Sequence, residues 1–486
     1  MAVSDFLPTS SSSSHRAAGP ASFVAAVLVI GLFAIAALDR VGAPEGLVRA
    51  LGPALTLIVF AGAGLSARNA DLPSFLAAGR RLDVSYGAFA LLLFIAGLAF
   101  CLYGRNPASG AANWPSAVAV AAGVFGLGPL LRRFGATWRS DVIATRFPSW
   151  PVRWASGVAM LGVAALTAYA GFRGASGVLV SEAGADRAQA EAIVSAAIAL
   201  GSIPGGVASL VVSAAAGAGA LLAMLAAAIL LKGGFPLAGA SLFNDSIPRT
   251  GLIATIATAV ATGGFFVLDP PAVTSRNSRA SLRSARGALV LCFALAAAIV
   301  WIAPLQAPVE VTDAAIKSLT GGAALAAYLA VACVGVHGCS RALGIVLDAP
   351  PRPFPLLASV RLARIRAVHL LAIAACVAAD ERALVEPEAA LTAAMAFSLA
   401  FTLPLLGLAA LRRAGSLAAS AALAVGLALF AFRLQYVPRP VSPGSLIETG
   451  LVAAIAAFIL GALVSLVAPR QGQASRPFES FADPSG

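Results

Sequence analysis

Charged residues are scarce in this sequence of 486 residues: they make up 11% of it, whereas hydrophobic residues make up 59%. Ordinary soluble domains carry about 25% charged residues. A chain this apolar could not cover itself with polar surface in water. Disordered chains are polar and charged, so disorder is excluded as well. The composition therefore predicts an all-α polytopic membrane protein, in which length is best counted in spans of about 20 apolar residues.

Aromatic residues are also few, at 7%, and no GxxxxGK[ST] phosphate loop occurs. A platform for stacking nucleic-acid bases is therefore unsupported, and the chain has no nucleotide motor of its own. The formal net charge of +12 would suggest a nucleic-acid partner in a soluble protein. In a membrane protein it reflects Lys and Arg held in cytoplasmic loops. We expect the partners to be the lipid bilayer and a small solute, with no nucleic acid.

The cysteines do not have the pattern of a disulfide framework or a structural zinc site. All five lie within apolar stretches and none forms a CxxC pair, which argues against disulfides and a structural zinc site. We expect them to be small packing residues, and the sequence identifies neither a cofactor nor a metal site.

Long apolar runs fill most of the chain. They lie near 21–38, 50–67, 84–103, 116–131, 154–172, 188–204, 207–231, 251–268, 287–304, 321–340, 367–379, 389–411, 414–432 and 447–468. They predict about 13–14 transmembrane helices, since 367–379 is short for a span. Residues 1–20 are expected to be a disordered polar head, 21–468 a transmembrane domain and 469–486 a cytoplasmic tail. The first run could be a signal-peptide core, but no small-residue cleavage pattern follows it, which favours a retained helix.

Positive charge gives an orientation. With the N-terminus in the cytoplasm, the inside loops hold roughly two thirds of the 33 Lys and Arg residues, including the four richest in arginine. This predicts an even number of spans and a place in a plasma membrane, which we expect to be the bacterial inner membrane.

Ionisable residues inside the runs are nearly absent, and such residues are usually functional in a membrane. The best candidate is His337, which lies among Gly335, Gly338 and Ser340. It could be a titratable or solute-contacting group beside a loosened helix. The commoner alternative is a histidine satisfied by a backbone carbonyl at a helix contact. His369 begins a run near Arg364 and Arg366, and we expect it to be interfacial.

A second candidate region is the run GLIATIATAVATGGFFVLDPP, in which Thr258 and Thr262 share a helical face and Gly263 and Gly264 follow. A glycine pair permits an unwound stretch whose backbone groups could bind an ion or solute. The alternative is that these small residues let helices pack closely.

Several loop motifs, taken in order, resemble the sodium:solute symporter family, and most closely its acetate-permease branch. They are DLPSFLAAGRRLDVSYGAFA at 71–90, RRFGATWRSDVIATRFPSWPVR at 132–153, GGVAS at 205–209, SRNSRASLRSAR at 275–286, VRLARIRAVH at 360–369 and AFSLAFTLPLLGLAALRRAGSLAASAALAVGL at 396–427. Each motif is weak alone, but together they span about residues 46–430.

The resemblance implies a leucine-transporter-like core of two inverted five-helix repeats, the first helix of each being broken, at about 84–103 and 251–268. It also implies cation ligands in the stretch VGVHGCS, where His337 and Gly338 stand in place of the family's hydroxyl pair and only Ser340 remains. The stretch LLLFIAGLAF, at 91–100, lacks the polar residues that the family carries near its first break. The resemblance therefore implies the fold more strongly than it implies sodium coupling.

The leading hypothesis is a secondary active transporter, in which Na⁺ or H⁺ drives symport of a small organic solute by alternating access. A monocarboxylate is one candidate solute, and the expected pathway residues are Thr258, Thr262, Gly263, Gly264, His337 and Ser340. The alternative is a transport-inactive paralogue that acts as a membrane scaffold or sensor. An enzyme is disfavoured, because no acids, histidines or cysteines cluster at one depth.

Overall fold

The computed structural model describes residues 18–68, 75, 84–103, 143, 146–231, 313–348, 357–382, 385–411, 413–436 and 443–468. Every regular element in these ranges is helical. The helices are α1 (Ala18–Arg40), α2 (Glu45–Ser66), α4 (Val84–Tyr103), α7 (Trp150–Ala183), α8 (Arg187–Ser202), α9 (Val207–Leu231), α13 (Ala314–Asp348), α14 (Ala358–Glu381), α15 (Pro387–Phe397), the π-helix η5 (Ser398–Thr402), α16 (Leu403–Ala410), α17 (Ser416–Tyr436) and α18 (Pro443–Val467).

Nine helical segments in the described ranges are long and apolar enough to cross a membrane. The predicted all-α polytopic architecture is therefore confirmed, and the chain is an integral membrane protein. The predicted runs near 116–131, 251–268 and 287–304 lie outside the described residues. The short run at 367–379 belongs to α14, which extends it at both ends to 24 residues.

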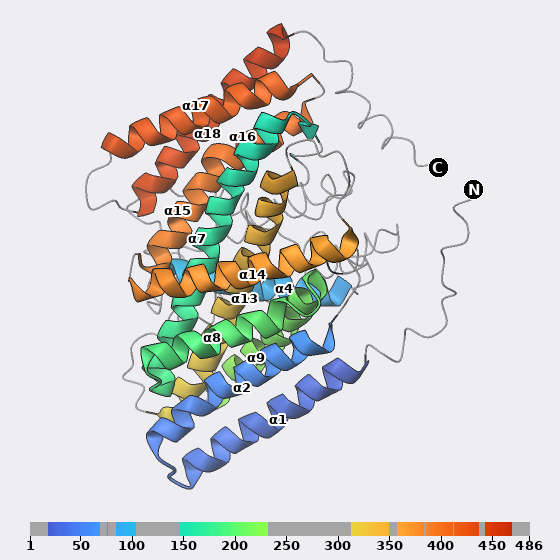
Figure 1. Ribbon diagram of the computed structural model, residues 1–486. Coiled ribbons are helices and arrows are strands. Elements are labelled where there is room, and N and C mark those ends of the chain that lie inside the picture. Colours follow the sequence, from blue (N-terminus) through green and yellow to red (C-terminus); the bar gives the residue numbers. More distant parts are fainter. Residues whose placement is uncertain are drawn as a thin grey trace, which may run out of the picture.

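The helix α13 is the centre of the bundle. Of its most apolar window, 94% is buried, and α7, α2, α9 and α4 all pack against it. Figure 1 shows α1 and α2 on one side of the molecule and the packed pair α17 and α18 on the other. A helix that is apolar all round is stable only when it is enclosed by others or by lipid. The 35 residues of α13 meet this condition through protein contacts.

Small residues set the helix spacing around α13. The Gly52 amide donates to Ser318 Oγ at 2.8 Å, and Thr56 Oγ1 donates to the Gly322 carbonyl at 2.8 Å. A Cβ on Gly52 would lie 2.0 Å from the Ser318 carbonyl oxygen. The backbones of α2 and α13 thus touch directly, which is how membrane helices gain packing energy without a hydrophobic effect between them.

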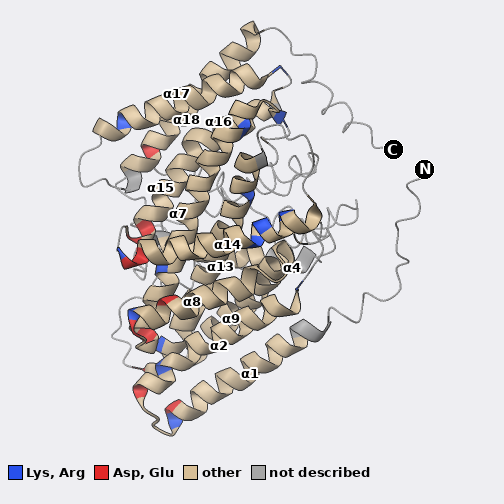
Figure 2. Cartoon of the chain, in the orientation of Figure 1, with Lys and Arg blue, Asp and Glu red and all other residues tan. Residues whose placement is uncertain are grey.

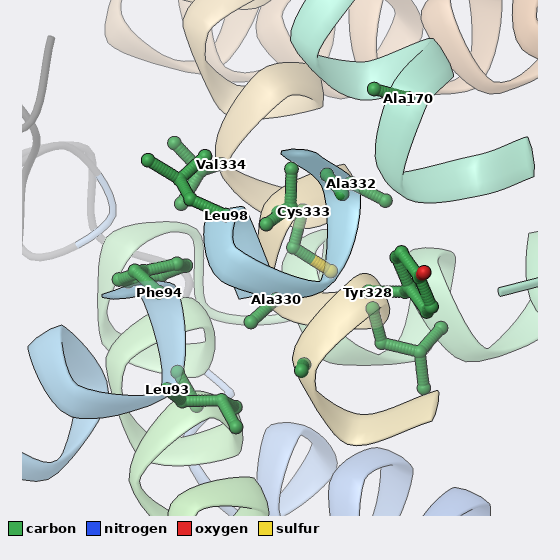
Figure 3. Packing of buried hydrophobic residues seen from close by; sticks show 14 of the residues in the cluster. Leu93, Phe94, Leu98, Ala170, Tyr328, Ala330, Ala332, Cys333 and Val334 are labelled. Atoms are coloured by element: carbon green, nitrogen blue, oxygen red, sulfur yellow. The ribbon is translucent and has the colours of Figure 1, made fainter. Parts of the chain in front are cut away.

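The helix α4 is continuous from Val84 to Tyr103, so the expected break within 84–103 is wrong. Its apolar stretch packs on α13, as Figure 3 shows for Leu98 beside Cys333 and Val334. Gly97 lets α4 approach α13 closely, because a Cβ there would lie 2.5 Å from the Ala327 carbonyl oxygen. The sequence here offers no side chains to replace broken helical hydrogen bonds, and an unbroken helix satisfies them internally.

The predicted run 389–411 is a helix interrupted by one π turn. Ser398–Thr402 is buried between α15 and α16. Two glycines pack on this region: a Cβ on Gly426 of α17 would lie 2.6 Å from the Ala400 carbonyl oxygen, and one on Gly450 of α18 would lie 2.6 Å from that of Ala396. Single π turns within α-helices are often found at functional sites. Here the turn is held by the neighbouring helices α17 and α18.

The basic loop motif at 132–153 supplies the cap of α16. Arg146 is buried and donates from Nη2 to the Leu411 carbonyl at 2.9 Å and from Nε to that of Ala409 at 3.3 Å. These are the last carbonyls of a helix, where a cation is favoured. Burial lowers the pKa of the Arg146 guanidinium from its ordinary value.

Acidic side chains gather at one edge of the molecule. Figure 2 shows them at the left of the view, around the α1–α2 and α7–α8 turns and the start of α15. The opposite edge holds the arginines of the first turns of α14, which include Arg364 and Arg366. The orientation drawn from positive charge would place this arginine edge in the cytoplasm. That orientation stays a prediction.

Candidate functional site

The structure brings His337 together with a second histidine that the sequence does not predict as its partner. His337 lies on α13 and His369 on α14, and both are buried, with 2% and 0% of their surfaces exposed. His369 Nε2 lies 3.1 Å from His337 Nδ1, and the rings meet edge to face with their centroids 4.4 Å apart. The expectation that His369 is interfacial concerns its depth in the membrane and stays a prediction, but the residue is enclosed by protein. We call these two residues the histidine pair.

Hydrogen bonding determines the tautomer of His369. Its Nδ1 lies 2.8 Å from the Ile365 carbonyl oxygen, one turn earlier in α14. A carbonyl only accepts, so Nδ1 carries the hydrogen and donates it. A neutral His369 then has a bare Nε2, which accepts from His337 Nδ1–H. In a neutral pair each histidine therefore carries its hydrogen on Nδ1.

Two side chains and one turn surround the histidine pair. Phe75 is buried with its ring 6.4 Å from that of His337 and 6.1 Å from that of His369. The Arg366 guanidinium lies 5.6 Å from the centre of the Phe75 ring, within cation–π range. The His337 ring also interacts with the backbone of Ser202 and Gly206, in the turn that joins α8 to α9.

That turn is held tightly against Phe75. Gly206 has a φ of 62°, in the left-handed region that favours glycine. A Cβ there would lie 2.3 Å from the Phe75 carbonyl oxygen. Gly205 makes a similar close approach to the carbonyl of Ala67, at 2.0 Å. The GGVAS motif thus places the backbone of one turn against the segment that contains Phe75.

Ser340 belongs to the same region but does not reach the ring of His337. Its hydroxyl donates to the His337 carbonyl at 2.8 Å, a bond within α13. The remaining predicted pathway residues, Thr258, Thr262, Gly263 and Gly264, lie outside the described residues. The structure therefore places two of the six and adds His369 and Phe75.

A second polar cluster lies at the C-terminal end of α14. Asp380 has no exposed surface, and its Oδ1 lies 2.8 Å from Arg173 Nη1 of α7, while its Oδ2 lies 3.4 Å from Arg187 Nη2 of α8. Ser176 Oγ donates to Asp380 Oδ2 at 3.4 Å, and Arg187 Nε lies 3.0 Å from Glu191 Oε1. We call these five residues the Asp380 cluster. Since their charges are paired within hydrogen-bond distance, the cluster ties α7, α8 and α14 together.

One feature of the sequence could have indicated the histidine pair, and none indicates the Asp380 cluster. Only three histidines occur in the chain, and two of them lie at apolar stretches. Asp380 follows a short apolar run directly, where an acid is ordinarily solvated.

In the described ranges, no group of three or more His, Cys, Asp and Glu side chains is arranged to hold a metal ion. The four described cysteines are free and buried, and Cys292 lies outside the described residues.

No family model and no curated protein matches this chain. Among solved structures it is similar to a Na⁺-coupled sialic acid symporter in its substrate-bound outward-open state. The TM-score is 0.65, at 12% identity over 91% of this chain and 98% of the other. Mhp1 in its inward-facing conformation gives a TM-score of 0.41, at 14% identity over 87% of this chain and 97% of that one. The first likeness shows the fold, which is of the leucine-transporter-like class.

Proposed function

We propose that this protein is a secondary active transporter of the sodium:solute symporter kind, closest to the acetate-permease branch, in the bacterial inner membrane. It would carry a small organic solute, with a monocarboxylate as the first candidate, by cation-coupled symport and alternating access. The single observation that carries the proposal is the fold that 91% of the chain shares with a cation-coupled symporter. Fold alone does not imply function, so the site has to support it.

The histidine pair supports cation coupling. It lies on α13, which contains the stretch VGVHGCS that the family resemblance assigns to cation ligands. A buried ionisable group in a membrane helix is costly and is usually retained for function. The other proposed pathway residues are Ser340 and the segment with Thr258, Thr262, Gly263 and Gly264.

The contact between α4 and α13 favours H⁺ over Na⁺. A hard cation requires several oxygen ligands. Here the contact consists of Leu, Phe, Ala and Val side chains, together with the Tyr328 hydroxyl, which donates to the Phe100 carbonyl at 3.0 Å. The same apolar contact is the specific observation that favours the second candidate function, a transport-inactive scaffold or sensor.

Uptake by proteoliposomes containing the full chain tests the two functions against each other. Radiolabelled acetate, pyruvate, lactate and a panel of amino acids and sugars would be offered under imposed Na⁺ or H⁺ gradients. We expect uptake of at least one solute above that of protein-free liposomes, driven by one of the gradients. Folded protein that moves none of these solutes would overturn the transporter proposal and favour the scaffold.

A further inference from the structure

The hydrogen bonds around the histidine pair form a chain between backbone groups. At one end His369 Nδ1–H donates to the Ile365 carbonyl. In the middle, one hydrogen lies between His369 Nε2 and His337 Nδ1. At the other end, the His337 ring meets the backbone of Ser202 and Gly206, and its Nε2 is buried. The carbonyls of this turn can accept a hydrogen but cannot donate one.

Counting hydrogens along this chain gives its charge. Two neutral histidines hold two ring hydrogens, which serve the Ile365 bond and the bond between the rings. A hydrogen on the buried His337 Nε2 would be the third. Four ring nitrogens with three hydrogens make a pair that carries one positive charge.

The surroundings act on that charge in both directions. The helix α8 ends at Ser202, so the negative end of its dipole lies at the turn and favours a cation. The carbonyl at Ile365, which accepts from His369 Nδ1–H, favours it as well. Burial opposes it, as do the charged groups that act on the pair, Arg341 of α13 and Arg366 of α14. Proton affinity therefore depends on how close the α8–α9 turn lies to α13.

We propose that the histidine pair is a binding site for a single proton shared by the two rings, and that this proton is the coupling ion of the transporter. The coupling role rests on the proposed function; the site does not. A proton enters as the third ring hydrogen, and it leaves when a helix movement separates the turn from His337. A second proton is excluded, because two imidazolium rings whose nitrogens are 3.1 Å apart would repel each other.

Solid-state NMR of the full chain in lipid bilayers, with ¹⁵N-labelled histidine, reads the site directly. The chain has only three histidines, and His15→Ala leaves those of the pair. We expect both rings to change together in one step as the pH falls, with one bare nitrogen lost from the pair rather than two. In His337→Gln and His369→Gln the remaining ring should titrate alone, at a different pH. Cys376→Ala, a buried change on α14, should keep the joint step.

Two rings that titrate separately in the His15→Ala protein, or that keep a bare nitrogen throughout, would overturn the proton site even where uptake is seen. Uptake measured in parallel tests the coupling role. We expect a solute gradient built by an imposed pH gradient, lost in His337→Gln and kept in Cys376→Ala. Uptake driven by Na⁺ and unchanged in His337→Gln would overturn that role. Absence of all uptake would overturn the proposed function, and the NMR titration would still decide the site.

Discussion

The helix α14 carries buried polar groups of opposite kinds at its end and at its middle. At its C-terminal end Asp380 holds two arginines from α7 and α8 at hydrogen-bond distance. At its middle His369 meets His337 of α13. The two positions are eleven residues apart, which is about 16 Å along a helix. One cluster pairs acidic side chains with arginines, whereas we propose that the other changes its charge with a single proton.

The Asp380 cluster fastens three helices together, whereas the histidine pair is proposed to change its charge. Opposite charges enclosed together are held in place, because removing either one leaves the other buried without compensation. A histidine pair can hold two or three ring hydrogens, and so carries either no charge or one positive charge. We therefore propose that α14 stays attached to α7 and α8 at Asp380, while its contact with α13 and the α8–α9 turn at His369 responds to protons.

The largest expected loss of stability comes from breaking the Asp380 cluster. Asp380→Ala would leave Arg173 and Arg187 without their shared carboxylate, and we expect it to cost about 3–5 kcal/mol of unfolding free energy. Glu386→Gln is the matched control, because that carboxylate is 78% exposed and lies 3.9 Å from Arg173. We expect the control to cost at most about 1 kcal/mol. Denaturant unfolding in mixed micelles measures both. Equal costs would contradict the claim that the Asp380 cluster ties α7, α8 and α14 together.

A smaller effect is expected at the turn beside the histidine pair. Gly206→Ala forces a Cβ to within 2.3 Å of the Phe75 carbonyl oxygen and adds the cost of a left-handed alanine. The two contributions are about 1–3 kcal/mol and about 1–2 kcal/mol. Gly184→Ala is the control, since Gly184 has a φ of 67° with nothing within 4 Å of its Cβ position.

The difference between these two alanine variants isolates the contact of the turn with Phe75. We expect Gly206→Ala to be the less stable of the two in the same unfolding assay. It should also weaken the joint titration of the histidines, which Gly184→Ala should leave in place. Variants of equal stability would show that the turn can move away from Phe75 freely, and the histidine pair would then lose its proposed third partner.

The smallest effect is expected where α4 meets α13. Tyr328→Phe removes one hydrogen bond to the Phe100 carbonyl and should cost about 0.5–1.5 kcal/mol. Since that contact is apolar packing, we expect no change in which ion drives uptake. A change in ion dependence would place a cation site at this contact after all, and would move the coupling site away from the histidine pair.

Much of the architecture is readable from the residues. Runs such as 207–231 and 447–468 are predominantly apolar, and the structure has a helix at each. The sequence also indicates His337 as the internal ionisable group. The break that the family resemblance implies at α4 is wrong, because LLLFIAGLAF has no side chains to replace broken backbone hydrogen bonds and the structure has one continuous helix there.

The sequence by itself determined that this chain lies in a bilayer, since its spans contain too few charges for water and enough apolar residues for lipid. It also determined how few groups could do chemistry there. Only the tertiary structure decided which of these groups meet. His337 and His369 are 32 residues apart, and Arg173 and Asp380 are 207 apart. Local periodicity carries no information about contacts between helices, because they depend on how the helices cross, and here small residues on α2, α7 and α13 determine those crossings.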